Sequence, residues 1–481
     1  MKSLAKNSIY NIIYQTISLV FPLITSVYIS RILLEDGVGK VAYAQNVASY
    51  FLSFAALGFP AYGIREIAKV RDNQIEKNKA FTEMLAINAV STTLSTATYL
   101  LLIVSVASFR NELALYICSG LLIFFNLINI DWLYQGEEEY RYITGRNLVI
   151  KILSIIAMIL FVRSKSDYCL YALISSLGSA GNNLFNILHA HKYVKLDLKN
   201  LHLKKHIKPL LILTLAGFFG NIYNKIDITM LGSMATEASV GYYSNAHKII
   251  LILVSCCQAI SVAFLPRLSY YYKNDKKRLD SLVSKGIDVL LSISMPALMG
   301  VFLLAQNVIV LLYGNNFAPA GVTLAVFAPL IIIRPLGDLL CYQLLICSGN
   351  EEKRIPAYIA ASILNIGLNA CLIPRICENG AAIASVITEL FVNTIQLHYT
   401  IRIVKLKIDT THILKTATAT LIMSAGVLLV KALNVGQMFT IVISVFLGIL
   451  LYFSVLVLLK DTFATDAKNF VFQYLSKSSK K

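Results

Sequence analysis

Hydrophobic residues fall along this chain in blocks of about twenty, separated by short polar gaps. An α-helix needs about twenty apolar residues to cross the ~30 Å hydrocarbon core of a bilayer. The blocks lack the alternation of polar and apolar positions that marks barrel strands. The pattern predicts an all-α polytopic membrane protein with about fourteen transmembrane helices. The predicted spans are residues 8–30, 38–60, 82–107, 112–134, 146–163, 168–189, 207–233, 240–264, 283–306, 319–347, 355–374, 379–401, 412–432 and 437–459.

Composition agrees with a membrane protein and indicates its orientation. Of 481 residues, 57% are hydrophobic and 14% are charged, and the net charge is +17. Most of the Lys and Arg lie in the N-terminal tail, the even-numbered gaps and the C-terminal tail, which the positive-inside rule places in the cytoplasm. We therefore expect both termini to be cytoplasmic. The basic charge belongs to this rim, so a nucleic-acid partner is not expected.

The sequence lacks the motifs of common catalytic and metal sites. It has no GxxxxGK[ST], GxSxG or HExxH motif, and the short gaps leave no room for a soluble catalytic domain. The eight cysteines include no CxxC pair, so we interpret them as free thiols. We expect a transporter, with no enzymatic activity, no metal and no cofactor, and we leave open a coupled proton or sodium ion.

A weak internal repeat suggests two lobes. Val38-Gly39 opens the second span, and Val240-Gly241 opens the eighth, 202 residues later. A displacement of six spans preserves orientation, so the repeat predicts two parallel six-helix lobes around a central cavity, as in some transporters. The predicted organisation is an N-terminal lobe (1–200), a C-terminal lobe (201–408), and spans 13 and 14 with a cytoplasmic tail (409–481).

An acidic run follows span 4, where Asp131-Trp132 leads into Gln135-Gly136-Glu137-Glu138-Glu139. Three consecutive carboxylates do not share a helix face. A solvated turn is therefore the favoured interpretation over a metal site.

Ionisable residues inside spans are the candidates for function, because a charge at mid-membrane costs at least about 2.5 kcal/mol. Span 10 carries Arg334, with Asp338 at i+4 and prolines at 329 and 335. The two charges form either a self-neutralising structural pair or a ligand-binding Arg whose charge Asp338 tunes. Glu389 in span 12 is a candidate proton or sodium site, or else a helix contact.

Three more cations lie in other spans. Lys225 is in span 7, with Asp227 two residues on, Lys248 is in span 8, and Arg31 ends span 1. The alternative for the lysines is snorkelling to the interface, and for Arg31 an interface anchor. Together with Arg334 they predict a cationic cleft between the lobes that would attract an anion such as phosphate.

Several stretches resemble one family. The segment FPLITSVYISRILLEDGVGKVAYAQNVASYFLSFAALGFPAYGIREIAKVRDN resembles the opening of the polysaccharide-repeat flippases, the O-antigen and capsule translocases of the MATE-like multidrug/oligosaccharidyl-lipid/polysaccharide superfamily. DWLYQGEEEY, NKIDITMLGSMATEASVGYYSNAHKI, LLYGNNFAPAG and NGAAIASVITE resemble later motifs of that family. Where the family has a small residue and Gly after the Arg of YISR, this chain has Ile32-Leu33-Leu34-Glu35.

The resemblance implies a flippase in the bacterial cytoplasmic membrane that moves an undecaprenyl-diphosphate-linked oligosaccharide to the outer leaflet. It implies a substrate-binding role for Arg31, Lys225, Lys248 and Arg334, and leaves Asp227, Asp338 and Glu389 for ion coupling or charge tuning. Membrane lipids, a polysaccharide polymerase and chain-length proteins are the expected partners.

Two other functions remain as alternatives. An ion-coupled multidrug or cation antiporter of the same superfamily would need a cavity dominated by carboxylates. A glycosyltransferase or repeat polymerase would need a large outer loop or a soluble domain, which the short gaps exclude.

Overall fold

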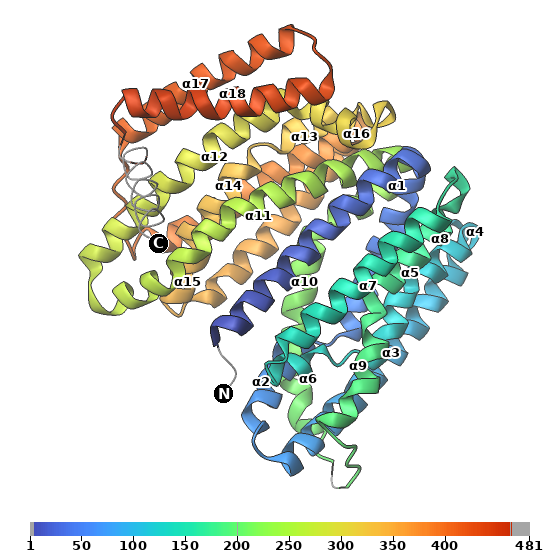
Figure 1. Ribbon diagram of the computed structural model, residues 1–481. Helices are drawn as coiled ribbons and strands as arrows, with labels where there is room; N and C mark the ends of the chain where they lie inside the picture. The colour runs from blue at the N-terminus through green and yellow to red at the C-terminus, as the bar shows by residue number, and fades with distance from the viewer. Residues whose placement is uncertain (1–3, 200, 462, 464–481) are drawn as a thin grey trace, which may run out of the picture. The chain divides into compact units, whose positions relative to one another are not determined.

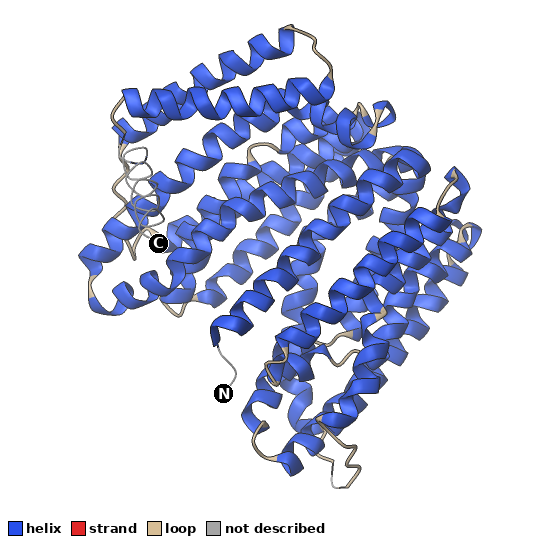
Figure 2. Ribbon diagram, in the orientation of Figure 1, coloured by secondary structure: helices blue, strands red, loops and turns tan. Residues whose placement is uncertain are grey.

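The computed structural model describes residues 4–199, 201–461 and 463, and all regular structure in this part of the chain is helical (Figures 1 and 2). The chain divides into two compact units, Met1–Gly241 and Tyr242–Lys481, which we describe separately. The prediction of an all-α membrane fold is confirmed. The lobe boundaries expected at residues 200 and 408 stay a prediction, and residues 464–481 of the expected tail lie outside the described part.

Unit 1 contains ten α-helices. They are α1 (Leu4–Ala55), α2 (Phe59–Val70), α3 (Gln74–Ser105), α4 (Ala107–Asn111), α5 (Leu113–Phe125), α6 (Asp131–Gly136), α7 (Tyr140–Phe161), α8 (Tyr168–Ala180), α9 (Asn182–His189) and α10 (Lys204–Met234), with 3₁₀ turns η1 (Asn126–Ile128), η2 (Lys165–Asp167) and η3 (Ala190–Lys192). The first residues of α11 also belong to this unit.

Among its described residues, unit 2 continues α11 and adds seven α-helices and a π-helix. The elements are α11 (Glu237–Asn274), α12 (Lys276–Tyr313), α13 (Ala320–Phe327), α14 (Leu330–Gly337), the π-helix η5 (Asp338–Gln343), α15 (Leu344–Cys347), α16 (Arg354–Thr400), α17 (Thr410–Ala432) and α18 (Gln437–Leu458), with 3₁₀ turns η4 (Asn315–Phe317) and η6 (Glu351–Lys353).

Within the described residues, nine helical stretches are long and apolar enough to cross a membrane, and Leu113–Ile128 is a shorter one. Two of the nine, Ile13–Val70 and Glu351–Thr400, are too long for one pass. Each contains a backbone break inside a predicted gap, at Leu34 and at Ile376–Cys377. The chain is therefore a multi-pass membrane protein, and the count of fourteen spans stays a prediction.

Leu34 holds its break in a conformation that leucine rarely adopts, with φ 59° and ψ −171°. Side chains with a Cβ are disfavoured at positive φ, which glycine tolerates. The sequence departure after Arg31 thus puts leucine where the backbone favours glycine. Such a residue costs on the order of 1–3 kcal/mol and persists only where its surroundings hold it.

The predicted gap between spans 8 and 9 is helical except at one residue. Helix α11 runs to Asn274 and α12 starts at Lys276, so Asp275 alone lies between them. The Asp275 carboxylate accepts a hydrogen bond from the backbone N–H of Arg278 and caps α12. The basic residues of this gap therefore sit on helical extensions of the two spans.

Trp132 organises the core of unit 1. Its ring centroid lies 6.2 Å from that of Phe59 and 5.6 Å from that of Phe81. Gly63 of α2 lies so close that a Cβ there would overlap the indole. The DWLYQG segment thus seats the short α6 against α2, which is a packing role for part of the motif.

The hairpin of α17 and α18 packs along α12 (Figure 1). His412 of α17 links Ser292 of α12, at 3.0 Å from its Nε2, to Asp461 beyond α18, at 2.9 Å from its Nδ1. Tyr452 of α18 donates to the Ser292 carbonyl oxygen at 2.6 Å. The last two helices are therefore anchored to unit 2 by buried polar contacts as well as by apolar packing.

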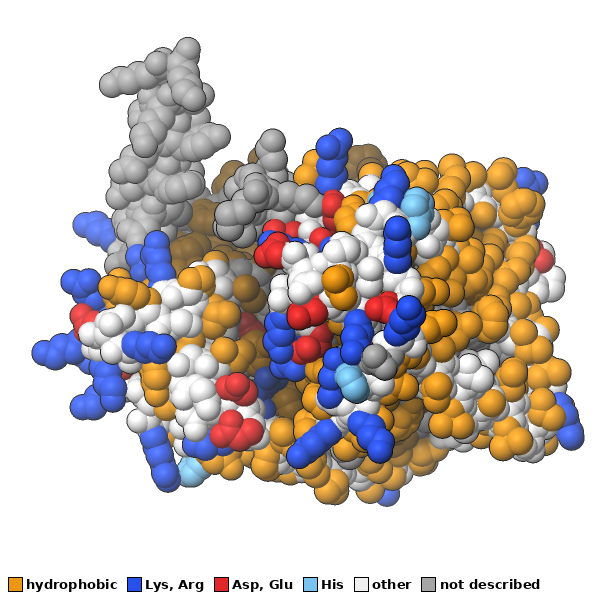
Figure 3. Space-filling view, turned by 90° about the horizontal axis from the view of Figure 1, so that it is seen from below, with side chains coloured by type: hydrophobic (Ala, Val, Ile, Leu, Met, Phe, Trp, Pro, Cys, Tyr) orange, Lys and Arg blue, Asp and Glu red, His pale blue; other side chains and the backbone are white. Residues whose placement is uncertain are grey.

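Side-chain type changes sharply between the ends and the flanks of the helices. Charged side chains gather on the end seen in Figure 3, and hydrophobic side chains cover the adjoining flank. Many large apolar residues are more than half exposed, among them Leu188, Leu429 and Phe446. Such exposure is expected where lipid chains replace water as the solvent.

Candidate functional site

In unit 1, a ladder of amide and hydroxyl groups joins α1 to α10. Asn46 donates to the Thr229 hydroxyl at 2.7 Å and to the Lys225 carbonyl at 3.3 Å. Asn221 donates to the Ser53 hydroxyl at 2.6 Å. Polar side chains between membrane helices fix register in this way. Asn221, four residues before Lys225 on α10, is thus used for helix packing.

The candidate residues of unit 1 have different surroundings. Lys225 is partly exposed on α10, whereas Asp227, two residues on, is 5% exposed. Arg31 is exposed on α1, one turn before the break at Leu34. The ladder places α1 and α10 side by side, so Arg31 and Lys225 lie on packed neighbours. Their convergence on one ligand stays a prediction.

In unit 2, the helix that carries Arg334 changes its winding. Pro335 lacks a backbone N–H and cannot extend the α-helical hydrogen-bond ladder. The chain then forms the π-helix η5 from Asp338 to Gln343. π-helical turns are rare in proteins, but those that occur are often found at functional sites. The expected disturbance of span 10 by proline is thus present, as a change of helix type.

Arg334 forms an ion pair with Glu389 of α16. Its Nε donates to the Glu389 carboxylate at 3.1 Å, and the two side chains are 18% and 15% exposed. The sequence spacing had favoured Asp338 as the partner. The sequence analysis selected Glu389 separately, as an ion site. Arg334 and Glu389 carry opposite charges within predicted spans, and this was the available signal that the two residues could meet.

Asp338 takes part in a different set of hydrogen bonds. Its carboxylate accepts from the Ser261 hydroxyl at 2.7 Å and from the Gln343 side-chain amide at 2.8 Å. Gln343 also donates to Ser261 at 2.7 Å. This triangle ties α11 to the π-helix. Ser261 and Gln343 are polar residues that the sequence analysis did not select.

Lys248 lies on α11, where its ammonium donates to the Asn245 side chain at 3.2 Å. The side chain is only partly exposed, and the hydrogen-bonded amide holds it beside its own helix. Of the candidate residues, Arg334 and Glu389 are the pair that the structure brings into contact. Whether the cations of the two units share one cavity stays a prediction.

A second feature of unit 2 is an apolar cavity of about 560 Å³. It lies among α11, α12, α13, α17 and α18, and its few polar members are Ser292, Ser444 and Tyr452. Gly300 of α12 and Gly448 of α18 line it. Because membrane lipid is already apolar, such a groove selects a hydrocarbon by shape and packing rather than by hydrophobicity.

The acidic run after α6 forms a turn at Glu137 and Glu138, and its carboxylates have partners. Glu137 pairs with Lys77 at 2.9 Å in a nearly buried contact, and Glu138 pairs with Arg71 at 3.0 Å. Glu139 accepts from the Tyr193 hydroxyl at 2.8 Å. No group of three metal-ligating side chains occurs in the described part of the chain. The expected turn is present, and its carboxylates also form structural links to Arg71 after α2, to Lys77 of α3 and to Tyr193.

Comparison with known proteins gives matches along most of the chain. The family model "Polysaccharide biosynthesis protein" matches residues 4–272, and "Lipid II flippase MurJ" matches residues 182–451. A "Putative O-antigen transporter" of Escherichia coli K12 is 23% identical over 402 residues, covering 82% of this chain and 96% of that protein. "Capsular polysaccharide biosynthesis protein CapF" of Staphylococcus aureus is 22% identical over 408 residues, covering 82% and 98%.

Solved structures give the same fold. The lipid II flippase MurJ in an inward closed conformation superposes with a TM-score of 0.76 at 15% identity, covering 95% of this chain and 99% of that one. An inward-facing MATE multidrug transporter gives 0.65 at 15% identity, covering 82% and 98%. The relatives are transporters rather than enzymes. The chain belongs to the polysaccharide biosynthesis protein family, the polysaccharide flippases of the multidrug/oligosaccharidyl-lipid/polysaccharide superfamily.

Proposed function

We propose that the protein moves an undecaprenyl-diphosphate-linked oligosaccharide repeat from the inner to the outer leaflet of a bacterial cytoplasmic membrane, for assembly of O-antigen or capsule. The observation that carries the proposal is the alignment with a putative O-antigen transporter over 96% of its length. A similar alignment with a capsular polysaccharide protein supports the substrate class. Both termini would be cytoplasmic, and a polymerase with its chain-length proteins would consume the product.

The chemistry of such a substrate divides into parts that this chain can meet separately. The diphosphate is anionic and suits Arg and Lys donors, of which Arg31, Lys225, Lys248 and Arg334 are the candidates. The isoprenoid chain is a branched hydrocarbon. The apolar cavity among α11, α12, α13, α17 and α18 has the lining to hold part of it.

The pair of Arg334 and Glu389 suggests a coupling step. A phosphate that accepts hydrogen bonds from Arg334 competes with the Glu389 carboxylate for the same donor. A carboxylate displaced in this way favours a proton or a sodium ion as its new partner. Glu389 would then couple an ion gradient to substrate binding, and removal of the product outside is the other source of drive. Alternating access of two lobes would carry the headgroup across.

Filling the apolar cavity gives a test of this division. Gly300 lines the cavity, and a Cβ there would meet no atom within 4 Å. We expect Gly300→Leu to fold normally, because Leu favours a helix by about 0.8–1 kcal/mol over Gly. Transport should fall at least about fivefold, measured as surface polysaccharide when the variant is expressed in a deletion strain at matched abundance.

The control is Gly367→Leu, which also meets open space, on the exposed side of α16 and outside the cavity. It should complement fully. Full complementation by Gly300→Leu as well would remove the cavity from the transport path. Increased sensitivity of the deletion strain to cationic drugs, with normal surface polysaccharide, would instead support the antiporter.

A further inference from the structure

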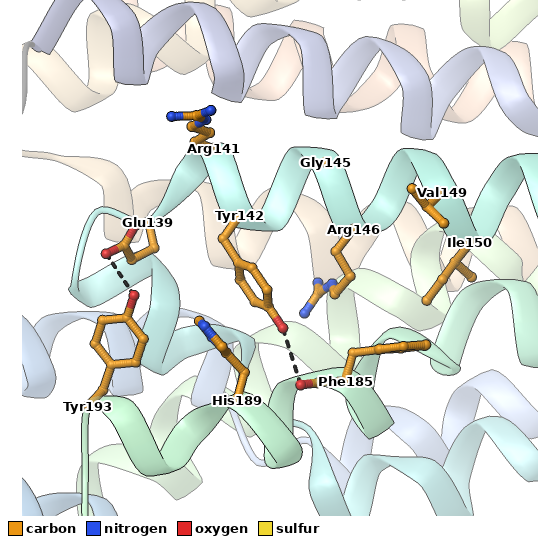
Figure 4. Close-up of a pocket in the computed structure, with 10 residues that line it drawn as sticks. All are labelled: Glu139, Arg141, Tyr142, Gly145, Arg146, Val149, Ile150, Phe185, His189 and Tyr193. Carbon is orange, nitrogen blue, oxygen red and sulfur yellow. Dashed lines mark hydrogen bonds between the residues drawn. The ribbon is translucent and has the colours of Figure 1, made fainter.

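A second cavity lies in unit 1, away from the residues considered for transport. Its volume is about 570 Å³, and its ten lining residues are labelled in Figure 4. One wall is the first half of α7, and the other is α9 with the residues that follow it. The proposed function leaves this cavity unused.

Arg146 is the central side chain of the cavity. It is buried, with its side chain 5% exposed, and its Nη2 donates to the Asp131 carboxylate at 3.1 Å. Within the described residues, its Nε and Nη1 are buried without a hydrogen-bond partner. Figure 4 shows the guanidinium on the side of α7 that faces α9. A buried donor without an acceptor is unfavourable, and more so when it is charged. The arrangement therefore calls for an acceptor supplied by a ligand.

His189 lies on the opposite wall of the cavity, and its ring also lacks a hydrogen-bond partner at one buried nitrogen within the part of the chain that the structure describes. Its ring stacks on that of Tyr142, with centroids 4.4 Å apart and planes 20° apart. Its Nδ1 is buried without a partner among the described residues. The Tyr142 hydroxyl donates to the Phe185 carbonyl at 3.1 Å, which fixes the stacked pair. Two walls of the cavity thus present unsatisfied polar atoms held by rigid neighbours.

The cavity is lined by two guanidinium groups, those of Arg141 and Arg146, and by one carboxylate, that of Glu139. The Glu139 carboxylate already accepts from the Tyr193 hydroxyl (Figure 4), and Asp131 accepts from Asn186 as well as from Arg146. Both acidic groups at the cavity are therefore engaged in hydrogen bonds. The two donor nitrogens of Arg146 that lack an acceptor among the described residues, Nε and Nη1, suit the oxygens of a phosphate.

The mouth of the cavity is apolar. Val149 and Phe185 line it and are 55% and 53% exposed, and Leu188 beside them is 71% exposed. Arg146 is six residues into α7, or ~9 Å along the helix at 1.5 Å per residue. Arg146 is also the first residue of the predicted span 146–163, so it is expected near the boundary between headgroups and acyl chains. A ligand at this mouth needs both a phosphate and hydrocarbon chains.

We infer that this cavity binds the phosphate of a membrane phospholipid headgroup, through Arg146 and His189, with the acyl chains against Val149 and Phe185. The phosphate supplies an acceptor for the buried Arg146 donors, and the headgroup supplies a partner for His189 Nδ1. Its site is separate from the candidate transport residues, so the inference does not depend on the transported substrate.

Gly145 allows the inference to be tested without breaking a contact. It lines the cavity, and a Cβ there would meet no atom within 4 Å. Gly145→Leu should therefore fold, while its side chain fills the cavity. Native mass spectrometry of the purified full chain in neutral detergent, titrated with phosphatidylglycerol, should show at least a tenfold weaker affinity for this variant than for the wild type. Gly367→Leu should bind as the wild type does.

Two further ligands define the chemistry. Diacylglycerol with the same acyl chains should bind at least tenfold more weakly than phosphatidylglycerol, and equal binding would overturn the role of phosphate. Inorganic phosphate alone should not displace the lipid at millimolar concentration. Displacement would identify free phosphate as the ligand and overturn the lipid assignment.

A second variant guards against an indirect effect at Gly145. Arg146→Lys keeps the positive charge beside Asp131 but loses the forked donors, so phosphatidylglycerol affinity should fall several-fold at an unchanged melting temperature. Wild-type affinity in both Gly145→Leu and Arg146→Lys would overturn the assignment of the site.

Discussion

Replacing Gly39 by valine is expected to reduce transport by more than tenfold. Gly39 of α1 lies against the first turn of α11, where a Cβ would overlap the carbonyl group of Glu237. Gly241 makes the reciprocal contact, since its Cβ would overlap the carbonyl of Glu35. Backbone atoms yield much less than a flexible side chain, so the two helix segments cannot keep this contact. Surface polysaccharide in a complemented deletion strain is the measurement.

Gly241→Val should have the same effect, because the two contacts are related by the 202-residue repeat. Gly367→Val on α16 meets open space and serves as the matched control. Overpacking commonly costs about 1–3 kcal/mol, so membrane abundance and melting temperature must be measured alongside transport. Normal polysaccharide from Gly39→Val at normal abundance would show that this close approach is dispensable.

Arg334→Gln is expected to lose at least 90% of transport. The substitution removes a cation from the membrane interior and leaves the Glu389 carboxylate without its 3.1 Å partner. Arg334→Lys should rescue little, because lysine has no Nε and no planar fork. Surface polysaccharide at matched abundance reports the transport loss, and wild-type levels in Arg334→Gln would favour a purely structural role.

The double variant Arg334→Gln with Glu389→Gln separates structure from function. Breaking a buried pair by removing one partner costs on the order of 3–5 kcal/mol, whereas removing both charges costs much less. We therefore expect each single variant to melt at a lower temperature than the wild type, and the double variant to recover most of the loss. Transport should stay low in the double variant, and restored transport would contradict a direct role for the charges.

Much of the fold could be predicted because the bilayer constrains the chain strongly. A membrane helix must satisfy its backbone internally and must be about twenty residues long, so hydropathy was enough to predict an all-α multi-pass fold. The breaks at Leu34 and at Ile376–Cys377 fall in the predicted gaps. Hydropathy could not show that α11 and α12 extend beyond the membrane, because charged residues are equally compatible with loops and with exposed helices.

The sequence predicted which residues belong to the candidate site, but it did not predict which residue each of them contacts. The free-energy cost of a charge in the membrane identified Arg334 and Glu389 one at a time. Their ion pair joins two helices, and the two residues are 55 positions apart in the sequence. The local i, i+4 rule pointed to Asp338, which bonds to Ser261 and Gln343. Neutral polar residues cost little free energy inside a membrane helix, so they do not stand out in the sequence. Their roles depend on tertiary contacts that cannot be read from neighbouring residues.

The unused polar groups of Arg146 and His189 show the same limit. Arg146 falls at the start of a predicted span, where a basic residue has an ordinary explanation at the interface. Its pairing with Asp131 arises from the packing of α7 on α6, and the stacking of His189 on Tyr142 arises from the packing of α7 on α9. Only the three-dimensional arrangement identifies it as part of a cavity.

The most direct test of the central claim is where a lipid-linked repeat unit accumulates when the protein is absent. In a deletion strain with no second flippase, undecaprenyl-diphosphate-linked repeats should accumulate and surface polysaccharide should be lost. A membrane-impermeant glycosidase should cleave the accumulated lipid in inside-out vesicles and leave it intact in spheroplasts. Cleavage in spheroplasts at the wild-type level, with normal surface polysaccharide, would contradict the proposed function.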